Sequence, residues 1–352
     1  MRFKTLLFVL LASTSIVLAH EDEKPLCSDY GISRIGSTYP DSFGVIAYGE
    51  FLYWKAQMDG LDLALQLTPF VNNTNDASVV GLDFNWDPAF RVGLGYYFKG
   101  RDWDLSLEWT RFRTEASHSK AANGNTLFPF WGRVGTSDTR VLDRVSGHWD
   151  LHYDTLDLLF HPGYFRYQHF AVQPEFGVRR AWIDWDYTIN QSFFDPQDSL
   201  TLTQHLPYEN HYHGVGFLAG ANTKWFLGWG FQVYANALAS VIYGEFELDQ
   251  PSTVTLQGLS TTFKTASSQD YWRVRSNMHL AMGLAWEKLF ANNAVRLNIY
   301  LGYEFLIWFN QNQLYRARTE VFGPNDTLEF TPYIERDDLG LNGLSAGMRL
   351  EF

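Results

Sequence analysis

The chain has 352 residues, and its 39 Asp and Glu outnumber its 27 Lys and Arg, which gives a formal net charge of −12. This acidic balance argues against nucleic acid or an anionic lipid surface as a binding partner. Aromatic residues make up 17% of the chain, although its mean hydropathy is only −0.21. That combination indicates apolar side chains that alternate with polar ones.

Residues 1–19 have the features of a signal peptide. Two cations stand within the first four residues, an apolar run covers 5–18, and small residues end at Ala19. Cleavage after Ala19 would remove Arg2 and Lys4 and leave 25 basic against 39 acidic side chains, a net charge of −14. Residues 20–43 predict an irregular periplasmic arm. Its Cys27, the one cysteine of the chain, is expected to be a free thiol or to pair with another chain.

Strand patterns begin at residues 45–55, and 61–67 are expected to continue that strand beyond a bend at Gly60. The clearest pair follows. Apolar side chains at 90, 92, 94, 96 and 98 alternate with Arg91 and smaller residues, and after a polar turn at 99–102 the alternation resumes over 103–110. Successive side chains of a strand point to opposite faces. These residues therefore predict a hairpin with one apolar and one polar face.

The same alternation recurs in three further pairs. Residues 148–160 pair with 170–178 around a turn at 161–163, 215–221 pair with 229–237 around Gly228, and 272–286 pair with 295–305 around 291–293. In the first pair the apolar phase changes between Tyr153 and Leu156 and again at Arg179 and Arg180, which predicts two β-bulges. With a bulge there, Trp149 would lie on the apolar outer face.

The last strand is predicted at residues 339–352. Leu344, Ala346, Met348 and Leu350 alternate with small or charged residues, and the chain ends on Phe352. A strand edge cannot remain open in hydrocarbon, so the last strand of a membrane barrel has to pair with the first. This strand and its terminal Phe352 also look like the signal that barrel-assembly machinery reads in barrels of this kind.

The connections between the predicted strands alternate in length. Those near Gly100, Gly163, Gly228 and Asn293 are short and flanked by aromatic residues, which prefer the headgroup level of a membrane. The others are long and polar. The sequence therefore predicts an all-β fold over residues 44–352: a transmembrane antiparallel up-and-down β-barrel with short periplasmic turns and long extracellular loops. About ten strands are expected, or twelve if 79–86 forms strands of its own; a soluble β-sandwich is the alternative.

The face opposite the apolar one is expected to line the barrel interior. Its charged residues carry both signs, so the interior is either a hydrated path for solutes or a plug of salt bridges. Arg273 and Arg275, with His279 on the same strand and Arg296 on its partner, form a basic ladder. This ladder could attract anions, or it could be neutralised by Glu304 and the carboxylates of other strands. The predicted lining residues are Glu50, Arg91, Asp104, Glu108, His148, Asp150, His152, Glu175, Lys224, Arg273, Arg275, His279, Arg296, Glu304 and Arg349.

Metal binding and catalysis are the weaker interpretations of the polar residues. His211 with His213, and His148 with His152, share a strand face and could hold zinc, but a polar lining explains the same spacing. Ser146 with His148 has the residue types of a nucleophile and its base at a spacing that chance also gives. We therefore predict no metal, no cofactor and no catalytic residue.

One segment resembles a known family. The run from Gly49 to Leu61, Gly-Glu-Phe-Leu-Tyr-Trp-Lys-Ala-Gln-Met-Asp-Gly-Leu, is similar to the opening strand of pore-forming outer-membrane proteins related to the major outer membrane proteins of chlamydia-like and Legionella-type bacteria. The resemblance implies a general diffusion porin. The chlamydial relatives are rich in cysteine and cross-linked, whereas this chain has Cys27 alone.

Together these features predict a porin of the Gram-negative outer membrane for passive diffusion of small hydrophilic solutes and ions. Alternatives are a non-conducting surface barrel with a structural or adhesive role and, third, an outer-membrane enzyme. The expected partners are outer-membrane lipid and lipopolysaccharide, the barrel-assembly machinery, small solutes and, in a homo-oligomer, further copies of the chain.

Overall fold

The computed structural model describes residues 44–69, 76–98, 103–131, 141–167, 169–195, 200–257, 261–265, 268–290, 295–322, 327–334 and 336–352. The predicted signal peptide, the periplasmic arm with Cys27 and the turns at 99–102 and 291–294 lie outside these residues. Within them, no helix has the length and apolar character needed to cross a membrane.

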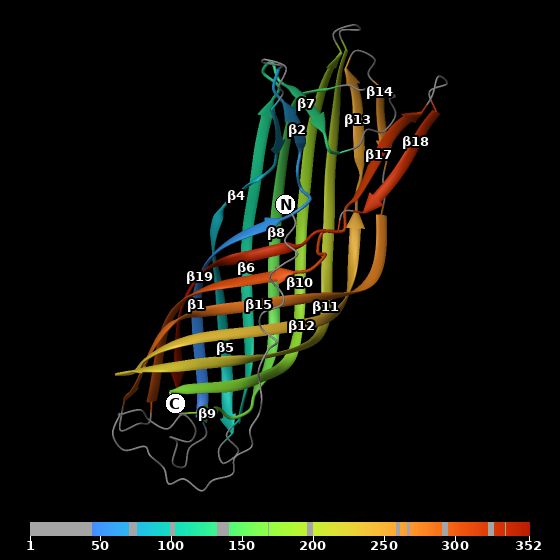
Figure 1. Cartoon of the computed structure of the whole chain (residues 1–352). Coiled ribbons are helices and arrows are strands. Elements are labelled where there is room, and N and C mark those ends of the chain that lie inside the picture. Colours follow the sequence, from blue (N-terminus) through green and yellow to red (C-terminus); the bar gives the residue numbers. More distant parts are fainter. Residues whose placement is uncertain are drawn as a thin grey trace.

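Ten long antiparallel strands close into a barrel (Figure 1). Closure is direct, because β1 pairs with β5 on one side and with β19 on the other. The fold class predicted from the alternating pattern is confirmed, with ten barrel strands and not twelve. In chain order they are β1 (Gly44–Met58), β5 (Trp86–Phe98), β6 (Trp103–Ala121), β8 (Leu142–His161), β10 (Phe170–Asp195), β11 (Leu200–Gly228), β12 (Phe231–Asp249), β15 (Ser268–Phe290), β16 (Val295–Trp308) and β19 (Leu339–Glu351).

The remaining strands are short. Residues 79–86, which could have supplied two more barrel strands, instead contribute to three elements: β3 pairs with β2, β4 with β6, and β5 begins at Trp86. Most of the short strands lie at the upper end of Figure 1, opposite the carboxyl terminus. They are β2 (Ala64–Leu67), β3 (Ala77–Val80), β4 (Asp83–Phe84), β7 (Thr126–Pro129), β9 (Phe165–Tyr167), β13 (Ser252–Gln257), β14 (Thr261–Thr265), β17 (Tyr315–Phe322) and β18 (Thr327–Ile334).

The turn between β11 and β12 shows how the lower connections stay short. Gly228 and Gly230 have φ of 103° and 86°, and Trp229 between them has φ of 53°. This backbone region favours glycine. The Trp229 ring is 95% exposed, so it projects from the lower end of the barrel, where an amphipathic ring suits a membrane interface.

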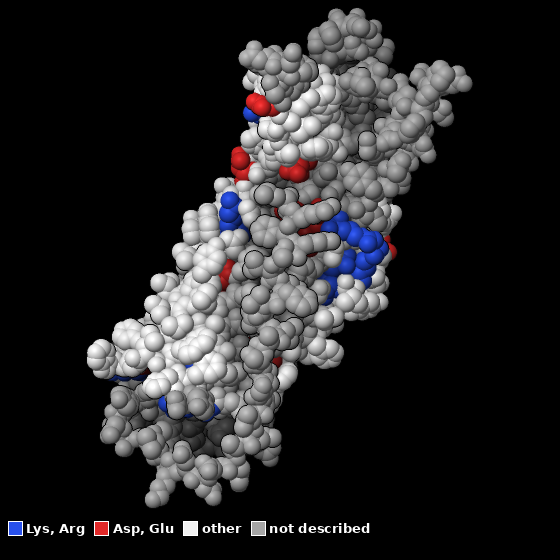
Figure 2. All heavy atoms as spheres, in the orientation of Figure 1, with Lys and Arg blue, Asp and Glu red and all other residues white. Residues whose placement is uncertain are grey.

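In the half of the barrel nearest these turns, the apolar side chains face outward as the sequence predicts. Leu94 is 66% exposed, Phe217 77% and Leu301 60%, and this part of the described surface is mostly free of charged atoms in Figure 2. Leu344 and Met348 of β19 are exposed on the same outer face. We call this part, with its apolar exterior, the membrane half.

Above it, in what we call the outer half, the two faces exchange character. Trp149, Leu151 and Tyr153 are buried inside the barrel, whereas His148 and His152 are exposed on its outside. The two predicted β-bulges are absent: the pairing of β8 with β6 and β10 is unbroken through Tyr153 and Leu156, and β10 runs unbroken through Arg179 and Arg180. The predicted outward orientation of Trp149 is wrong.

Strand length explains this exchange. β10 has 26 residues and β11 has 29, whereas a tilted strand needs only about 9 to 11 residues to cross the hydrocarbon. The outer half therefore extends into water, where polar side chains belong outside and apolar ones inside. The alternation of inward and outward side chains along each strand is unbroken, and only the surroundings change from hydrocarbon to water. In the sequence, this change looks like a shift of the alternation by one residue, as at a β-bulge.

Candidate functional site in the barrel interior

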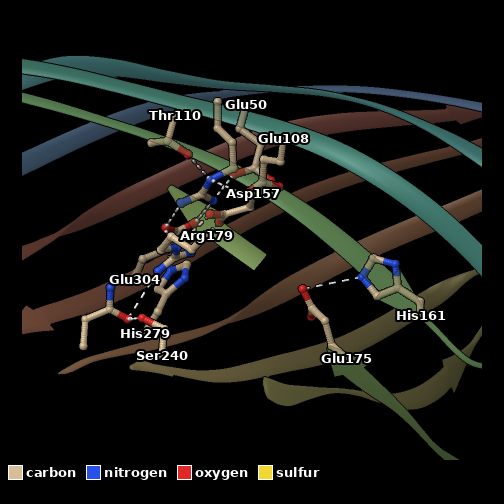
Figure 3. Close-up of polar contacts among 12 residues, drawn as sticks. Glu50, Glu108, Thr110, Asp157, His161, Glu175, Arg179, Ser240, His279 and Glu304 are labelled. Carbon is tan, nitrogen blue, oxygen red and sulfur yellow. Dashed lines mark hydrogen bonds and ion pairs between the residues drawn. The ribbon is translucent and has the colours of Figure 1, made fainter. Parts of the chain in front are cut away.

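Arg91 of β5 stands at the centre of a buried ionic cluster in the membrane half. Figure 3 shows its partners Glu50, Glu108 and Glu304. The Arg91 Nη1 lies 2.5 Å from Glu50 of β1 and its Nη2 lies 3.0 Å from Glu304 of β16. Its Nε donates to Thr110 Oγ1 at 3.1 Å and lies 3.4 Å from Glu108. The register brings this about, because Arg91 is the direct cross-strand partner of both Glu50 and Thr110.

A second buried arginine, Arg179 of β10, lies beside this cluster, because its partner Asp157 is the direct cross-strand neighbour of Glu108 (Figure 3). Its Nε and Nη2 donate to both carboxylate oxygens of Asp157 at 2.8 and 2.5 Å, and its Nη1 donates to Asn277 of β15 at 3.3 Å. Ser240 of β12 also donates to Asn277. A bidentate arginine–carboxylate pair of this kind has a fixed geometry, so these contacts hold β8, β10, β12 and β15 together across the bore.

Polar side chains continue from this layer toward the lower end. His161 lies between Asp104 at 2.8 Å and Glu175 at 3.5 Å, and Glu351 binds Arg296 and Arg349, each at 2.9 Å. Together with Glu50, Lys224 and His279, several of these groups line a cavity of about 170 Å³ inside the membrane half. The interior at this level is polar, with charges of both signs.

An aromatic layer lies directly above the ionic cluster. Trp54 of β1, Tyr153 of β8, Trp308 of β16 and Tyr212 of β11 come from different walls, and their exposed fractions are 1%, 1%, 0% and 0%. The Tyr153 and Trp308 ring centroids are 6.2 Å apart, and Tyr212 lies 6.3 Å from Trp308. Trp54 contacts Tyr153 at 6.5 Å and the Arg91 guanidinium at 5.7 Å. The rings therefore meet across the bore and exclude water at this level.

Most of the predicted lining residues face the interior. They are Glu50, Arg91, Asp104, Glu108, Glu175, Lys224, Arg273, Arg275, His279, Arg296, Glu304 and Arg349. The structure brings Glu50, Arg91, Glu108, His279 and Glu304 into one cluster, whereas Arg273 and Arg275 lie apart near the upper end of β15. Whether any of them lines a conducting pore stays a prediction.

Three predicted lining residues, His148, Asp150 and His152, face away from the interior. His148 and His152 are exposed and Asp150 is partly exposed, and His152 Nε2 lies 3.1 Å from Asp150. The reason is the unbroken phase of β8, which places their side chains on the water-facing surface of the outer half. The prediction that they face inward is wrong.

The prediction also missed interior residues, chiefly Asp157, His161 and Arg179. Asp157 lies between Leu156 and Leu158, whose predicted outward orientation already places it inside, but it was not among the predicted lining residues. His161 was assigned to a turn and Arg179 to a β-bulge, so neither was given a face. The unbroken pairing of β8 and β10 places all three side chains inside the barrel.

Several histidines of the outer surface lie near carboxylates. His211 Nδ1 is 3.3 Å from Asp184, and ligand atoms of His213, Glu245 and Glu247 all lie within 4.8 Å of one another. These residue types can hold a divalent metal. The side chains are partly or fully exposed, and exposed acidic groups are common without an ion, so the prediction of no metal stays a prediction.

Comparison with known families decides the relationship of the chain. The model of the family described as Legionella pneumophila major outer membrane protein precursor matches residues 46–352. The chain belongs to this family. The resemblance found at residues 49–61 is thereby confirmed for the Legionella-type proteins, and the family and the barrel together place the protein in the outer membrane.

A search of curated proteins finds no match. Among solved structures, the outer membrane protease OmpT from Escherichia coli is 7% identical with a TM-score of 0.42, and the match covers 90% of this chain and 99% of that one. A Pseudomonas aeruginosa FadL homologue is also 7% identical, with a TM-score of 0.24 and coverage of 89% and 90%. At these TM-scores neither likeness carries an argument about the activity of this family member.

Proposed function

We propose that this protein is a surface barrel of the outer membrane that is closed to solutes in the conformation described here. The observation that carries the proposal is the aromatic layer, in which Trp54, Tyr153, Tyr212 and Trp308 are at most 1% exposed and meet across the bore. Its role would then be structural, through its rigid wall and the polar surface of its outer half. This is the non-conducting alternative considered from the sequence.

The strength of the closure follows from the packing. Three ring contacts link the four aromatic residues, and a fourth joins Trp54 to Phe112. Each such contact contributes about 0.5–1.5 kcal/mol beyond the burial of its area, so separating all four costs about 2–6 kcal/mol before any apolar surface is hydrated. A spontaneously open state would accordingly be a minor population.

Passive diffusion of small hydrophilic solutes and ions, the function first predicted, is the second candidate. Two observations favour it: the charged cavity of about 170 Å³ in the membrane half, and membership of a family described by a major outer membrane protein. Conduction in this protein would require the aromatic layer to move, with Arg296 and Arg349 then among the charges that a solute meets.

We propose no catalytic role. Three His–Asp pairs of the outer half, His118 with Asp83, His152 with Asp150 and His211 with Asp184, have side chains that are between 29% and 74% exposed. Catalytic pairs work best where water is excluded, and each of these pairs is open to water. We further propose that the lipid partners contact the membrane half, and that the β19 strand with Phe352 is read by the barrel-assembly machinery.

Planar-bilayer recording of the purified, folded protein tests the first candidate against the second. We expect no stepwise conductance from the wild-type chain. Regular steps would overturn the closed-barrel proposal and favour the porin. In that case Arg296→Glu should shift the reversal potential toward cation preference, with Arg180→Glu, which changes an exposed outer arginine, as the matched control.

A further inference from the structure

Arg275 differs from the other arginines of the barrel wall. Its side chain faces inward from β15, is only 8% exposed, and lies over the Phe246 ring at 4.8 Å. Nη1 donates to the carbonyl of Val274 in its own strand at 3.1 Å. Nε and Nη2 are buried and have no hydrogen-bond partner. A buried guanidinium with two unused donors is costly unless an acceptor meets it.

The groups around Arg275 make its position more unusual. Arg273, two residues away on the same face, lies over the Tyr271 ring at 4.9 Å. Arg336, exposed just before β19, also repels the charge on Arg275. In the part of the chain that the structure describes, no carboxylate forms an ion pair with any of these three arginines. Among the described residues, these three cations therefore lie near one another without an ion-pair partner.

The two other buried arginines show what is missing. Arg91 has three carboxylates within 3.4 Å, and Arg179 binds both oxygens of Asp157. Inward guanidinium groups that link strands of the barrel are thus neutralised by carboxylates of the chain. In a protein with a surplus of acidic residues, a carboxylate near Arg275 would be easy to supply, which points to an anion from outside the chain.

One neutral donor, the Tyr212 hydroxyl, completes the arrangement. The Tyr212 hydroxyl is buried without a hydrogen-bond partner, and its ring packs 4.5 Å from Phe246, the ring on which Arg275 lies. Phe246 in turn stacks on Tyr271 at 5.5 Å, so the aromatic rings fix the positions of both β15 arginines. Guanidinium and phenol donors on a rigid apolar support are suited to binding an oxyanion.

We propose that Arg275, Arg273, Arg336 and Tyr212 form a binding site for a phosphate group near the extracellular end of β15. A phosphate monoester carries about −1.5 to −2 charges at neutral pH, which matches three cations better than the single charge of a carboxylate. The exposed Arg336 and the partly exposed Arg273 mark the side from which the group enters. Figure 2 shows Lys and Arg atoms gathered on the surface at the height where β15 curves upward in Figure 1.

The site lies beside the aromatic layer and shares Tyr212 with it. Its test measures phosphate binding and not conductance, so the two proposals can fail separately. Two sources could supply the phosphate group: free phosphate in the medium, or the headgroup of an anionic lipid of the outer leaflet. Both present the same oxyanion to the arginines.

Calorimetric titration of inorganic phosphate into the full-length protein in a zwitterionic detergent tests the proposal, with chloride at matched ionic strength as the reference. We expect saturable binding by the wild type, at least tenfold weaker in Arg275→Gln and in Arg336→Gln. Arg336 is exposed, so its variant remains informative if Arg275→Gln does not fold. Arg180→Gln removes another exposed arginine that lies over a ring, Trp182 at 4.6 Å, and should bind phosphate like the wild type.

Absence of saturable phosphate binding in the wild type would overturn the proposal, as would binding that neither the Arg275 nor the Arg336 change weakens. Vesicles then separate the two sources. If phosphatidylcholine vesicles containing lipid A reduce phosphate binding relative to phosphatidylcholine alone, the site takes the lipid headgroup; equal binding assigns it to free phosphate.

Thermal unfolding provides a readout that does not depend on added ligand. In phosphate-free buffer, Arg275→Met should raise the unfolding midpoint, because it removes a buried charge that nothing neutralises. Phosphate should raise the midpoint of the wild type and leave that of Arg275→Met unchanged. A lower midpoint for Arg275→Met in phosphate-free buffer would contradict the proposal.

Discussion

The membrane half and the outer half of the barrel put opposite chemistry on the same two faces. On β8, Asp157 points inward and Leu158 outward below, whereas Trp149 points inward and His148 outward above. The backbone alternates without interruption between these levels. The comparison teaches that a polar side chain marks the interior of a barrel only where the exterior is hydrocarbon, and marks the exterior where water surrounds the strands.

The interior of each half is stabilised by a different kind of contact. Below, arginines such as Arg91 satisfy buried carboxylates; above, the rings around Trp308 pack as in the core of a soluble domain. Four substitutions test this difference, taken from the largest expected effect to the smallest. For the first three, the free energy of unfolding is measured by urea titration in phospholipid vesicles and monitored by tryptophan fluorescence.

Arg91→Met should cost about 3–5 kcal/mol, because it leaves Glu50 and Glu304 buried without their partner. The matched control is Arg113→Met. Arg113 forms an ion pair with Asp154 on the exterior of the outer half, where its side chain is 33% exposed, and such surface pairs contribute about 0–1 kcal/mol. Equal losses from the two variants would contradict the distinction between buried and exterior pairs.

Trp308→Ala should cost about 3–5 kcal/mol, as is typical when a fully buried tryptophan is truncated and leaves a cavity. Trp229→Ala removes the same ring from the turn after β11, where it is 95% exposed, and should change stability by less than about 0.5 kcal/mol. If Trp308→Ala were also nearly neutral, the aromatic layer would not be the packed core of the outer half.

Leu301→Arg should cost about 2–4 kcal/mol, because the side chain lies at the middle of the outward apolar run of β16 and would place a charge in hydrocarbon. Gln57→Arg makes a similar change on the outward face of β1 above that level, and should shift the free energy of unfolding by less than about 0.5 kcal/mol. Similar costs at both positions would show that Gln57 also faces hydrocarbon, and that the boundary between the two halves lies higher on the barrel.

Asp59→Asn should have the smallest effect and the clearest pH dependence. Asp59 follows β1 in the turn above the barrel, where burial and, next, the carboxylates of Asp337 and Asp338 raise its pKa above the usual 3.8. Protonation therefore favours the folded state: this stabilisation is complete below the unfolded pKa and is lost as the pH rises through the folded pKa.

The Asn variant should accordingly be more stable than the wild type at neutral pH, by less than about 0.5 kcal/mol because the site is partly exposed. Its advantage should vanish below about pH 4. Thermal midpoints measured across this pH range check the sign. A variant that was more stable only in acid would show that the carboxylate, and not the acid, is the favoured form.

Much of the membrane half could be predicted from alternation alone. The hairpin of β5 and β6, the outward run of β15 and β16 and the closing strand β19 all have the predicted orientation, because hydrocarbon outside and water or ion pairs inside impose a simple pattern of period two. Within this half the alternation also identified Arg91, Glu50, Glu108 and Glu304 as inward, although it could not show that four strands bring them into contact.

The outer half could not be predicted in the same way. Trp149 and His152 were assigned to the wrong faces because the alternation records polarity and carries no information on whether lipid or water lies outside. A tilted strand crosses the hydrocarbon in about ten residues. Because β8, β10 and β11 are much longer than this, part of each strand must lie outside the membrane.

The sequence by itself determined the parts of the barrel strands that lie in the membrane half, the short connections at one end and the alternation along each strand, since these depend on neighbours two residues apart. Only the tertiary structure decided which face is inside at each height, that Tyr153 meets Trp308 across the bore, and that no carboxylate of the described residues forms an ion pair with Arg275. The physical reason is that these properties depend on strands distant in sequence and on the change from hydrocarbon to water along the barrel axis, which no local pattern encodes.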